Sequence, residues 1–329
     1  MKTIYFVIPC YNEEEVLEET ADRLLVKIEK LIENKKINTN SKIIFVDDGS
    51  KDKTWNIIDS LSYKNILFGG VKLSRNRGHQ NALLAGMLTV KDNCDAIISM
   101  DADLQDDIEV LDQFIEKFDN GCDVVYGVRS ERKKDTAFKK YTAQIFYKLM
   151  SKLGVDIVYN HADYRLMSKR AIESLEDFKE VNLFLRGIVP LIGYKSDVVL
   201  YERNERFAGE SKYPLKKMIA FALEGITSFS VKPIRMVFSM GVLVFSISLF
   251  ILIYSLSQWM LGKTIQGWTT TVASIWAIGG IQILCIGIVG EYIGKIYMET
   301  KSRPKFIIEK YINNSDEAKI KKNEILEVG

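Results

Sequence analysis

The sequence has few of the residues that build disulfide or zinc frameworks. Its 329 residues include only 4 cysteines and 2 histidines, and no CxxC pair occurs. Cys10, Cys94, Cys122 and Cys285 are widely spaced, so a reducing compartment is the simplest interpretation. Neither sign of charge predominates, because 45 Lys and Arg stand against 43 Asp and Glu. Nucleic-acid binding requires a basic excess, so we expect no nucleic-acid partner.

Two further absences narrow the function. A nicotinamide-binding unit requires GxGxxG after its first strand, but the segment PCYNEEE at residues 9–15 contains no glycine. The apolar run that precedes it is too short for a secretory signal and soon turns acidic, which predicts that the start of the chain stays in the cytoplasm. Apolar residues make up 47% of the chain, enough to bury a sizeable core, and the length predicts about two structural units.

Two long stretches, residues 236–262 and 264–290, carry no charge and are mostly apolar. About 20 such residues cross a bilayer as a helix, so we predict two transmembrane helices, with a buried hairpin in a soluble core as the alternative. Lys and Arg flank the pair on its outer sides, whereas Lys263 alone lies between the two stretches. Because cytoplasmic ends retain basic residues, we expect a two-span protein of the cell membrane with both termini in the cytoplasm.

The segment before the first span, residues 214–230, has apolar residues at helical spacing and Lys216 and Lys217 off that face. This pattern predicts an amphipathic helix at the membrane surface, and a helix of the soluble domain is the alternative. In the second span, Gly279, Gly280, Gly287 and Gly290 are small enough to let spans pack closely, as in a homo-oligomer, although the sequence leaves the oligomeric state open. Lipid-facing flexibility is the alternative for Gly287 and Gly290.

The first 130 residues alternate short β-branched runs with longer amphipathic stretches. We predict strands at residues 3–9, 42–47, 66–73, 95–100 and 123–127, with helices between them. This alternation is typical of an α/β fold with a mostly parallel sheet covered by helices. Ligands bind such sheets at the carboxyl ends of the strands.

Acidic residues follow three of these strands, in PCYNEE at 9–14, DDGS at 47–50 and DADLQDD at 101–107. Asp101 and Asp103 form an Asp-x-Asp pair, which offers hard oxygen ligands to Mg²⁺ or Mn²⁺. One such pair alone is more often a solvated turn. Three strand ends with the same chemistry favour a divalent cation that bridges a diphosphate.

Six segments occur in an order and at intervals that resemble a known family: VIPCYNEEE, VDDGS, SRNRGHQNALLAG, MDADLQDD, VVYGVRSER and ADYRLMS. The chain looks like family 2 glycosyltransferases of the polyprenyl-phosphate sugar transferase type, which include dolichol-phosphate mannose synthases and bactoprenol glucosyltransferases. Residues 206–235 and 290–309 also look like the juxtamembrane segments of the two-span members.

The resemblance implies a GT-A-type, Rossmann-like domain and a C-terminal two-helix transmembrane hairpin with amphipathic juxtamembrane helices. We therefore divide the chain into a cytoplasmic glycosyltransferase domain (1–212), an amphipathic juxtamembrane helix (213–234), two transmembrane helices (235–292) and a cytoplasmic juxtamembrane segment with a tail (293–329).

The resemblance also implies roles for individual residues. The nucleotide would contact Pro9, Tyr11, Glu13, Asp47 and Asp48, and the metal ion, Mg²⁺ or Mn²⁺, would contact Asp101, Asp103 and Gln105. Arg75, near His79 and ahead of a helix start, is placed to touch the nucleotide diphosphate.

Residues 129–140 are rich in Arg and Lys, which suits an anionic acceptor beside a membrane, and a solvated basic loop is the alternative. By resemblance, Arg129 and either Lys139 or Lys140 bind the acceptor phosphate. Asp163 stands where soluble relatives have a base, and it either acts as one or orients a substrate, while Arg165 would hold phosphate.

A phosphate monoester is already ionised near pH 7, so its oxygen needs no general base to attack an anomeric carbon. We therefore expect inverting, metal-dependent transfer of one sugar, glucose from UDP-glucose by resemblance, to polyprenyl (undecaprenyl) phosphate for the cell envelope. One alternative is a processive polysaccharide synthase, but the QxxRW motif and additional spans of such enzymes do not occur. A catalytically silent scaffold or lipid-binding protein would have a broken Asp-x-Asp pair, whereas Asp101 and Asp103 are both present.

Overall fold

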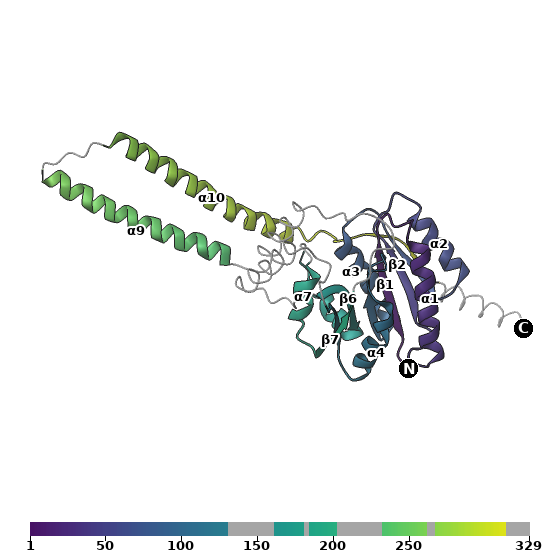
Figure 1. Ribbon diagram of the computed structural model, residues 1–329. Helices are drawn as coiled ribbons and strands as arrows, with labels where there is room; N and C mark the ends of the chain where they lie inside the picture. The colour runs from purple at the N-terminus through teal and green to yellow at the C-terminus, as the bar shows by residue number, and fades with distance from the viewer. Residues whose placement is uncertain (131–160, 181–183, 203–231, 262–266, 314–329) are drawn as a thin grey trace, which may run out of the picture. The chain divides into compact units, whose positions relative to one another are not determined.

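The computed structural model describes residues 1–130, 161–180, 184–202, 232–261 and 267–313 (Figure 1). The chain divides into two compact units. One contains an α/β domain together with the C-terminal strand, and the other contains two long helices. Each unit is described by itself.

The described part of the α/β unit is built on one sheet, with the strand order β7-β5-β6-β4-β1-β2-β3-β8. The strands are β1 (Ile4–Cys10), β2 (Lys42–Asp47), β3 (Phe68–Leu73), β4 (Ala96–Ser99), β5 (Val124–Arg129), β6 (His161–Ser168), β7 (Ser196–Tyr201) and β8 (Ile308–Ile312). The central run β4-β1-β2-β3 is parallel, and β7 is parallel to β5. β6 runs antiparallel between β4 and β5. The predicted mostly parallel α/β sheet is therefore confirmed.

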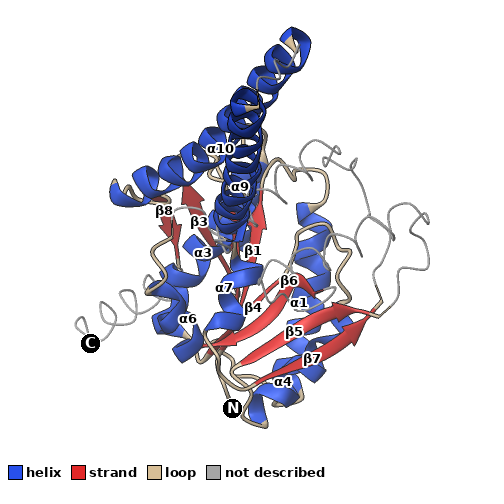
Figure 2. Cartoon of the chain, turned by 90° about the vertical axis from the view of Figure 1, so that its left-hand side faces the viewer, coloured by secondary structure: helices blue, strands red, loops and turns tan. Residues whose placement is uncertain are grey.

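Helices cover both faces of the sheet (Figure 2). One face carries α3 (His79–Val90), α6 (Lys169–Glu176) and α7 (Leu185–Leu191), and the other carries α1 (Leu17–Glu33), α2 (Thr54–Lys64) and α4 (Leu111–Asp119). Two short 3-10 turns, η1 (Lys91–Asn93) and η2 (Ile108–Val110), lead out of α3 and into α4. Because both faces are covered, every residue of β1 is buried, which explains its nearly continuous apolar sequence.

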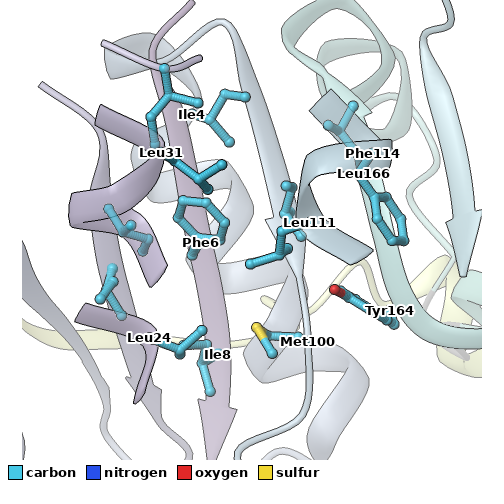
Figure 3. Packing of buried hydrophobic residues seen from close by; sticks show 14 of the residues in the cluster. Ile4, Phe6, Ile8, Leu24, Leu31, Met100, Leu111, Phe114, Tyr164 and Leu166 are labelled. Carbon is cyan, nitrogen blue, oxygen red and sulfur yellow. The ribbon is translucent and has the colours of Figure 1, made fainter. Parts of the chain in front are cut away.

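The core forms where amphipathic helices place their apolar stripes on the sheet. Leu24 and Leu31 of α1 pack in one cluster with Phe6 of β1, and Phe114 of α4 packs against Tyr164 of β6 (Figure 3). The stripe of α1 recurs at intervals of three, four and seven residues, which is the period of one helix face.

Helix α3 lies unusually close to the sheet because Gly86 has no side chain. A Cβ atom at this position would stand 2.5 Å from Val46 Cγ2 and 2.6 Å from Val7 Cγ1. The helix begins after Gly78, whose φ of 89° favours glycine. His79, the first residue of α3, lies near the residues that follow β4, with its Nε2 3.4 Å from Asp101 Oδ1.

The sequence analysis predicted β1 to β5 but did not predict β6, β7 or β8. The motif ADYRLMS lies within β6. Residues 293–329 were expected to form a juxtamembrane segment and tail, yet β8 pairs antiparallel with β3. Two ion pairs add to this pairing, Lys72 Nζ with Glu309 Oε1 at 2.8 Å and Lys310 Nζ with Asp59 Oδ1 at 3.0 Å. The strand β8 therefore covers an edge of β3 that would otherwise be open.

The second unit contains α9 (Lys232–Met260) and α10 (Trp268–Thr300), which run in opposite directions (Figure 1). Both helices are long and apolar enough to cross a membrane, over Ile234–Ile251 and Ile278–Thr300. Large apolar side chains such as Phe238, Phe250 and Ile283 are exposed along them. A water-soluble surface rarely presents so much apolar area, so these helices are candidate membrane spans. The amphipathic helix expected at 213–234 lies almost entirely outside the described residues.

Candidate active site

The carboxyl ends of β1 and β2 bring Asp47 into a buried position. Asp47 pairs in register with Cys10, and its side chain is 0% exposed. Its Oδ1 accepts a hydrogen bond from Ser50 N at 3.1 Å, whereas Oδ2 is buried and accepts none from any described residue. Burial raises the pKa of Asp47. A buried acceptor without a partner is costly, so Asp47 Oδ2 is suited to receive an N–H from a ligand.

Asp48 holds the loop that leads into α3. Its two carboxylate oxygens accept hydrogen bonds from Arg77 N at 2.7 Å and Gly78 N at 2.8 Å. The same loop passes so close to Gly49 that a Cβ there would stand 2.6 Å from the carbonyl carbon of Arg75. The structure therefore gives Asp48 a loop-positioning role beside its predicted contact with a nucleotide.

The other predicted nucleotide contacts lie along the same rim. Pro9 is buried at the end of β1, and Tyr11 and Glu13 are half-buried in the turn that follows. This turn is held to the β2–α2 loop, because Glu13 N donates a hydrogen bond to Thr54 Oγ1 at 2.9 Å. Arg75, in contrast, is exposed.

The Asp-x-Asp loop follows β4 and is held in a defined shape. Thr20 Oγ1 donates to the carbonyl of Ala102 at 2.7 Å, and Gln105 N donates to Asp103 Oδ1 at 3.2 Å. Leu104, between Asp103 and Gln105, has a φ of 56°, a left-handed conformation that turns the chain sharply. Asp101 and Asp103 are half-buried, and Gln105 is buried.

This loop fits a divalent cation. Asp101 Oδ1 is buried and accepts no hydrogen bond from any described residue, although His79 Nε2 lies 3.4 Å away. Among the described residues, no three His, Cys, Asp or Glu side chains gather into a complete metal cluster. Mg²⁺ and Mn²⁺ often take only one or two carboxylates from a protein and complete their shell with water and substrate phosphates. Asp101 and Asp103, with Gln105, suit such a shared site.

Behind Asp101, a buried carboxylate links the loop to β7. Tyr201 Oη donates to Asp106 Oδ1 at 2.7 Å, and Asp106 Oδ2 lies 3.4 Å from Asp101 N. Burial, and then the charge of Asp101, raise the pKa of Asp106 to about 7. Arg129 Nε in turn donates to Tyr201 Oη at 3.4 Å. A chain of contacts therefore connects the Asp-x-Asp loop with the arginine predicted to bind the acceptor.

Asp163 lies in β6 and pairs with two arginines. Its Oδ1 accepts from Arg165 Nη2 at 2.5 Å, and its Oδ2 accepts from Arg186 Nη2 at 3.1 Å. Burial alone would raise the pKa of Asp163, but the charges of Arg186, Arg165 and His79 outweigh it and hold the pKa far below its ordinary range. A carboxylate that resists protonation so strongly is a poor general base. Of the two roles left open for Asp163, the geometry favours orientation.

Arg165, predicted to hold phosphate, lies in an enclosed position. Its side chain is 1% exposed, donates to Asp163, and reaches the carbonyl of Leu185 with Nη1 at 3.4 Å. An arginine enclosed in this way is suited to support Asp163, while its Nε is buried without a partner among the described residues, and the phosphate contact stays a prediction.

Sequence reasoning missed Arg186, Asp106 and Tyr201. Arg186 is the only charged residue in the apolar run LFLRGIVP, and a lone charge in such a run was a usable signal. Asp106 belongs to a quoted motif but received no role, and Tyr201 ends a strand that was not predicted. Arg129 is half-buried at the end of β5, whereas Lys139 and Lys140 lie outside the described residues.

Comparison with known families agrees with this architecture. The family Glycosyl transferase family 2 matches residues 5–176, and the family GtrB C-terminal hairpin matches residues 232–296. The chain belongs to glycosyl transferase family 2, and its sheet is of the GT-A type, as the sequence motifs predicted.

Individual relatives match over almost their whole length. The glycosyltransferase YkoT of Bacillus subtilis (strain 168) is 53% identical over 97% of this chain and 94% of its own length. The bactoprenol glucosyl transferase of Shigella phage SfX is 41% identical over 93% of this chain and 98% of its own. Among solved structures, glucosyl-3-phosphoglycerate synthase from Mycobacterium tuberculosis, in complex with Mn²⁺, uridine-diphosphate and phosphoglyceric acid, aligns with a TM-score of 0.44 and 16% identity. That alignment covers 69% of this chain and 76% of the other.

Proposed function

We propose that this enzyme transfers a single glucose from UDP-glucose to polyprenyl phosphate, undecaprenyl phosphate in particular, at the cytoplasmic face of the cell membrane. The observation that carries the proposal is the contact chain from Asp101 through Asp106 and Tyr201 to Arg129. This chain of contacts supports a single site in which the acidic loop would hold a cation and Arg129 would meet the acceptor. The relatives named bactoprenol glucosyl transferase support the choice of sugar and lipid.

The acidic side of the site suits the nucleotide donor. Asp47 Oδ2, buried and without a partner among the described residues, would accept the N–H of a uracil ring. Asp101, Asp103 and Gln105 would hold Mg²⁺ or Mn²⁺. The chemistry that such a cation would supply is positive charge for a departing diphosphate.

The basic side of the site suits the acceptor. Arg129 is half-buried at the end of β5, where its planar fork of donors matches the geometry of a phosphate group. The helices α9 and α10 would cross the bilayer and keep the domain at the membrane surface, where a lipid phosphate is presented. Basic residues flank the two spans on their outer sides, which supports a cytoplasmic position for both termini.

The chemistry follows from the charge of the acceptor. Its phosphate monoester has a second pKa of about 6, so it is largely ionised at pH 7 and attacks without help from a base. A bond forms between a phosphate oxygen and the anomeric carbon, while the bond from that carbon to the diphosphate oxygen breaks. The electron pair leaves with UDP, and the configuration at the anomeric carbon inverts. Asp163, whose pKa is held far below the ordinary range, stays ionised throughout and orients the arginines that pair with it.

The test uses the full-length protein purified in detergent with Mn²⁺ or Mg²⁺, polyprenyl phosphate and a panel of labelled nucleotide sugars. We expect label from UDP-glucose to enter the organic phase, and none to enter when polyprenol without phosphate replaces the acceptor. Asp103→Ala should abolish transfer, and Arg129→Ala should raise the KM for the lipid. Turnover that persists in excess chelator would refute the metal assignment, and label that never partitions with the lipid would refute the acceptor.

A further inference from the structure

Asp163 contacts two arginines that differ in their access to solvent. Arg165 already meets the need of this carboxylate, with Nη2 2.5 Å from Oδ1. Arg186 adds a second guanidinium, with Nη2 3.1 Å from Oδ2 and Nε 3.4 Å from Oδ1. Both guanidinium groups therefore lie against the same carboxylate. The two differ in access, because the side chain of Arg165 is 2% exposed and that of Arg186 is 34% exposed.

Arg186 also acts on the arginine predicted to bind the acceptor. Burial lowers the pKa of Arg129 and so does the charge of Arg186, while Tyr201 and Asp106 outweigh both and raise it. Arg129 is the last residue of β5, and Arg186 lies in the first turn of α7. The positive charges of Arg129 and Arg186 repel each other, and an anion that contacts both would relieve that repulsion.

His79 connects this basic group with the Asp-x-Asp loop. Its Nε2 lies 3.4 Å from Asp101 Oδ1 and 3.7 Å from Asp163 Oδ2. His79 therefore lies between Asp101, which would hold the cation, and Asp163, which pairs with Arg186. An anion bound at Arg129 and Arg186 would stand next to the donor diphosphate, which is the placement that a transfer between the two requires.

We propose that Arg186 binds the phosphate of the lipid acceptor together with Arg129, and that Asp163 is the positioning residue that aims Arg186. The inference rests on the proposed function and extends it to a residue outside the sequence motifs. Two guanidinium forks supply enough donors for the three terminal oxygens of a phosphate monoester. The donor diphosphate is the other phosphate in the site, and the experiment separates the two.

The experiment compares Arg186→Gln and Arg186→Lys with the wild-type full-length protein. Initial rates are measured against polyprenyl phosphate at saturating UDP-glucose, and then against UDP-glucose at saturating lipid. We expect Arg186→Gln to raise the KM for the lipid about ten- to hundredfold, the effect of losing a hydrogen bond to a charged group. The KM for UDP-glucose should change less than about threefold on the same scale. Arg186→Lys retains the charge without the fork and should fall between the two.

Arg170→Gln is the matched control. Arg170 also pairs with a mostly buried carboxylate, that of Asp123, through Nε at 2.5 Å and through Nη2, but it lies on α6 away from the acidic loop. This variant should leave both KM values unchanged. Loss of Arg186 leaves Asp163 paired with Arg165, so we expect the Arg186 variants to fold, and thermal melting of each verifies this.

Three results would overturn the inference. A raised KM for UDP-glucose with an unchanged KM for the lipid would assign Arg186 to the donor diphosphate. A lower kcat with both KM values unchanged, or an equal effect in Arg170→Gln, would show a merely structural role. Failure of the proposed function itself looks different, because the wild-type protein would then place no label on the lipid.

Discussion

Asp163→Asn tests whether this carboxylate holds Arg165 and Arg186 in position or acts as a general base. Asparagine keeps the shape of the side chain and one acceptor oxygen but removes the charge that Arg165 and Arg186 share. The backbone of β6 at this point should be unaffected, because the carbonyl of residue 163 accepts from Ser99 Oγ at 2.5 Å independently of the side chain. The substitution therefore isolates the charge of Asp163.

The expected cost follows from the burial of Arg165. With 1% of its surface exposed, Arg165 would lose its countercharge without gaining contact with water. Removing one partner of a buried ion pair costs about 3–5 kcal/mol, a large part of the roughly 5–15 kcal/mol that stabilises a typical domain. We expect Asp163→Asn to fold with a clearly lowered denaturation midpoint. Arg186 would no longer be oriented by an ion pair with residue 163, and the KM for the lipid would rise.

The pH dependence has a definite sign. The pKa of Asp163 is lower in the folded than in the unfolded protein, where it is about 3.9. The stabilisation is therefore fully present above the unfolded pKa and is lost as pH falls through the folded pKa. Between about pH 5 and 8, the stability difference between wild type and Asp163→Asn should be constant.

Denaturant unfolding and kcat/KM are measured across this pH range for both proteins. If Asp163 only holds the two arginines in position, Asp163→Asn lowers stability and leaves the shape of the pH–rate profile unchanged. Unchanged stability, together with a wild-type rate that falls on protonation of a group absent from the variant, would refute the reasoning and restore Asp163 as a base.

Three further predictions concern the surroundings of the site. Tyr201→Phe removes the hydroxyl that donates to Asp106 and should destabilise the fold by about 1–3 kcal/mol, as thermal melts would show. It should also raise the Mn²⁺ concentration that activity requires, as a metal titration would show. An unaltered metal requirement would contradict this prediction. Gly86→Ala would gain about 1 kcal/mol of helix propensity, but its Cβ would lie 2.5 Å from Val46 Cγ2. We therefore expect a net loss of stability of up to about 2 kcal/mol in denaturant titrations, and lower activity because α3 shifts. A more stable variant would show that the helix can adjust. A chain that ends at Arg303 lacks β8 and should aggregate through the open edge of β3, whereas a chain that ends at Asn313 should not. Light scattering measures this aggregation. Equal behaviour of the two chains would contradict the role of β8 in covering the edge.

Local sequence patterns predicted one part of the candidate site and missed another part. The acids of the Asp-x-Asp loop were predictable because each follows a recognisable strand, and the carboxyl ends of parallel strands meet at one edge. Asp106 and Tyr201 were not, because their contact joins residues 95 positions apart and depends on β7, whose residues are largely exposed and show no clear alternation.

The sequence alone determined the class of fold, the two apolar helices and the acidic rim, because the period of apolar residues and the place of acids after strands are local properties of the chain. Tertiary structure alone decided the antiparallel entry of β6, the return of β8 to β3 and the partners of Asp163. Arg165 and Arg186 are both arginines near apolar residues in the sequence. Folding buries Arg165 and leaves Arg186 partly exposed, and this difference in burial depends on the whole packed domain, so the sequence alone does not show it.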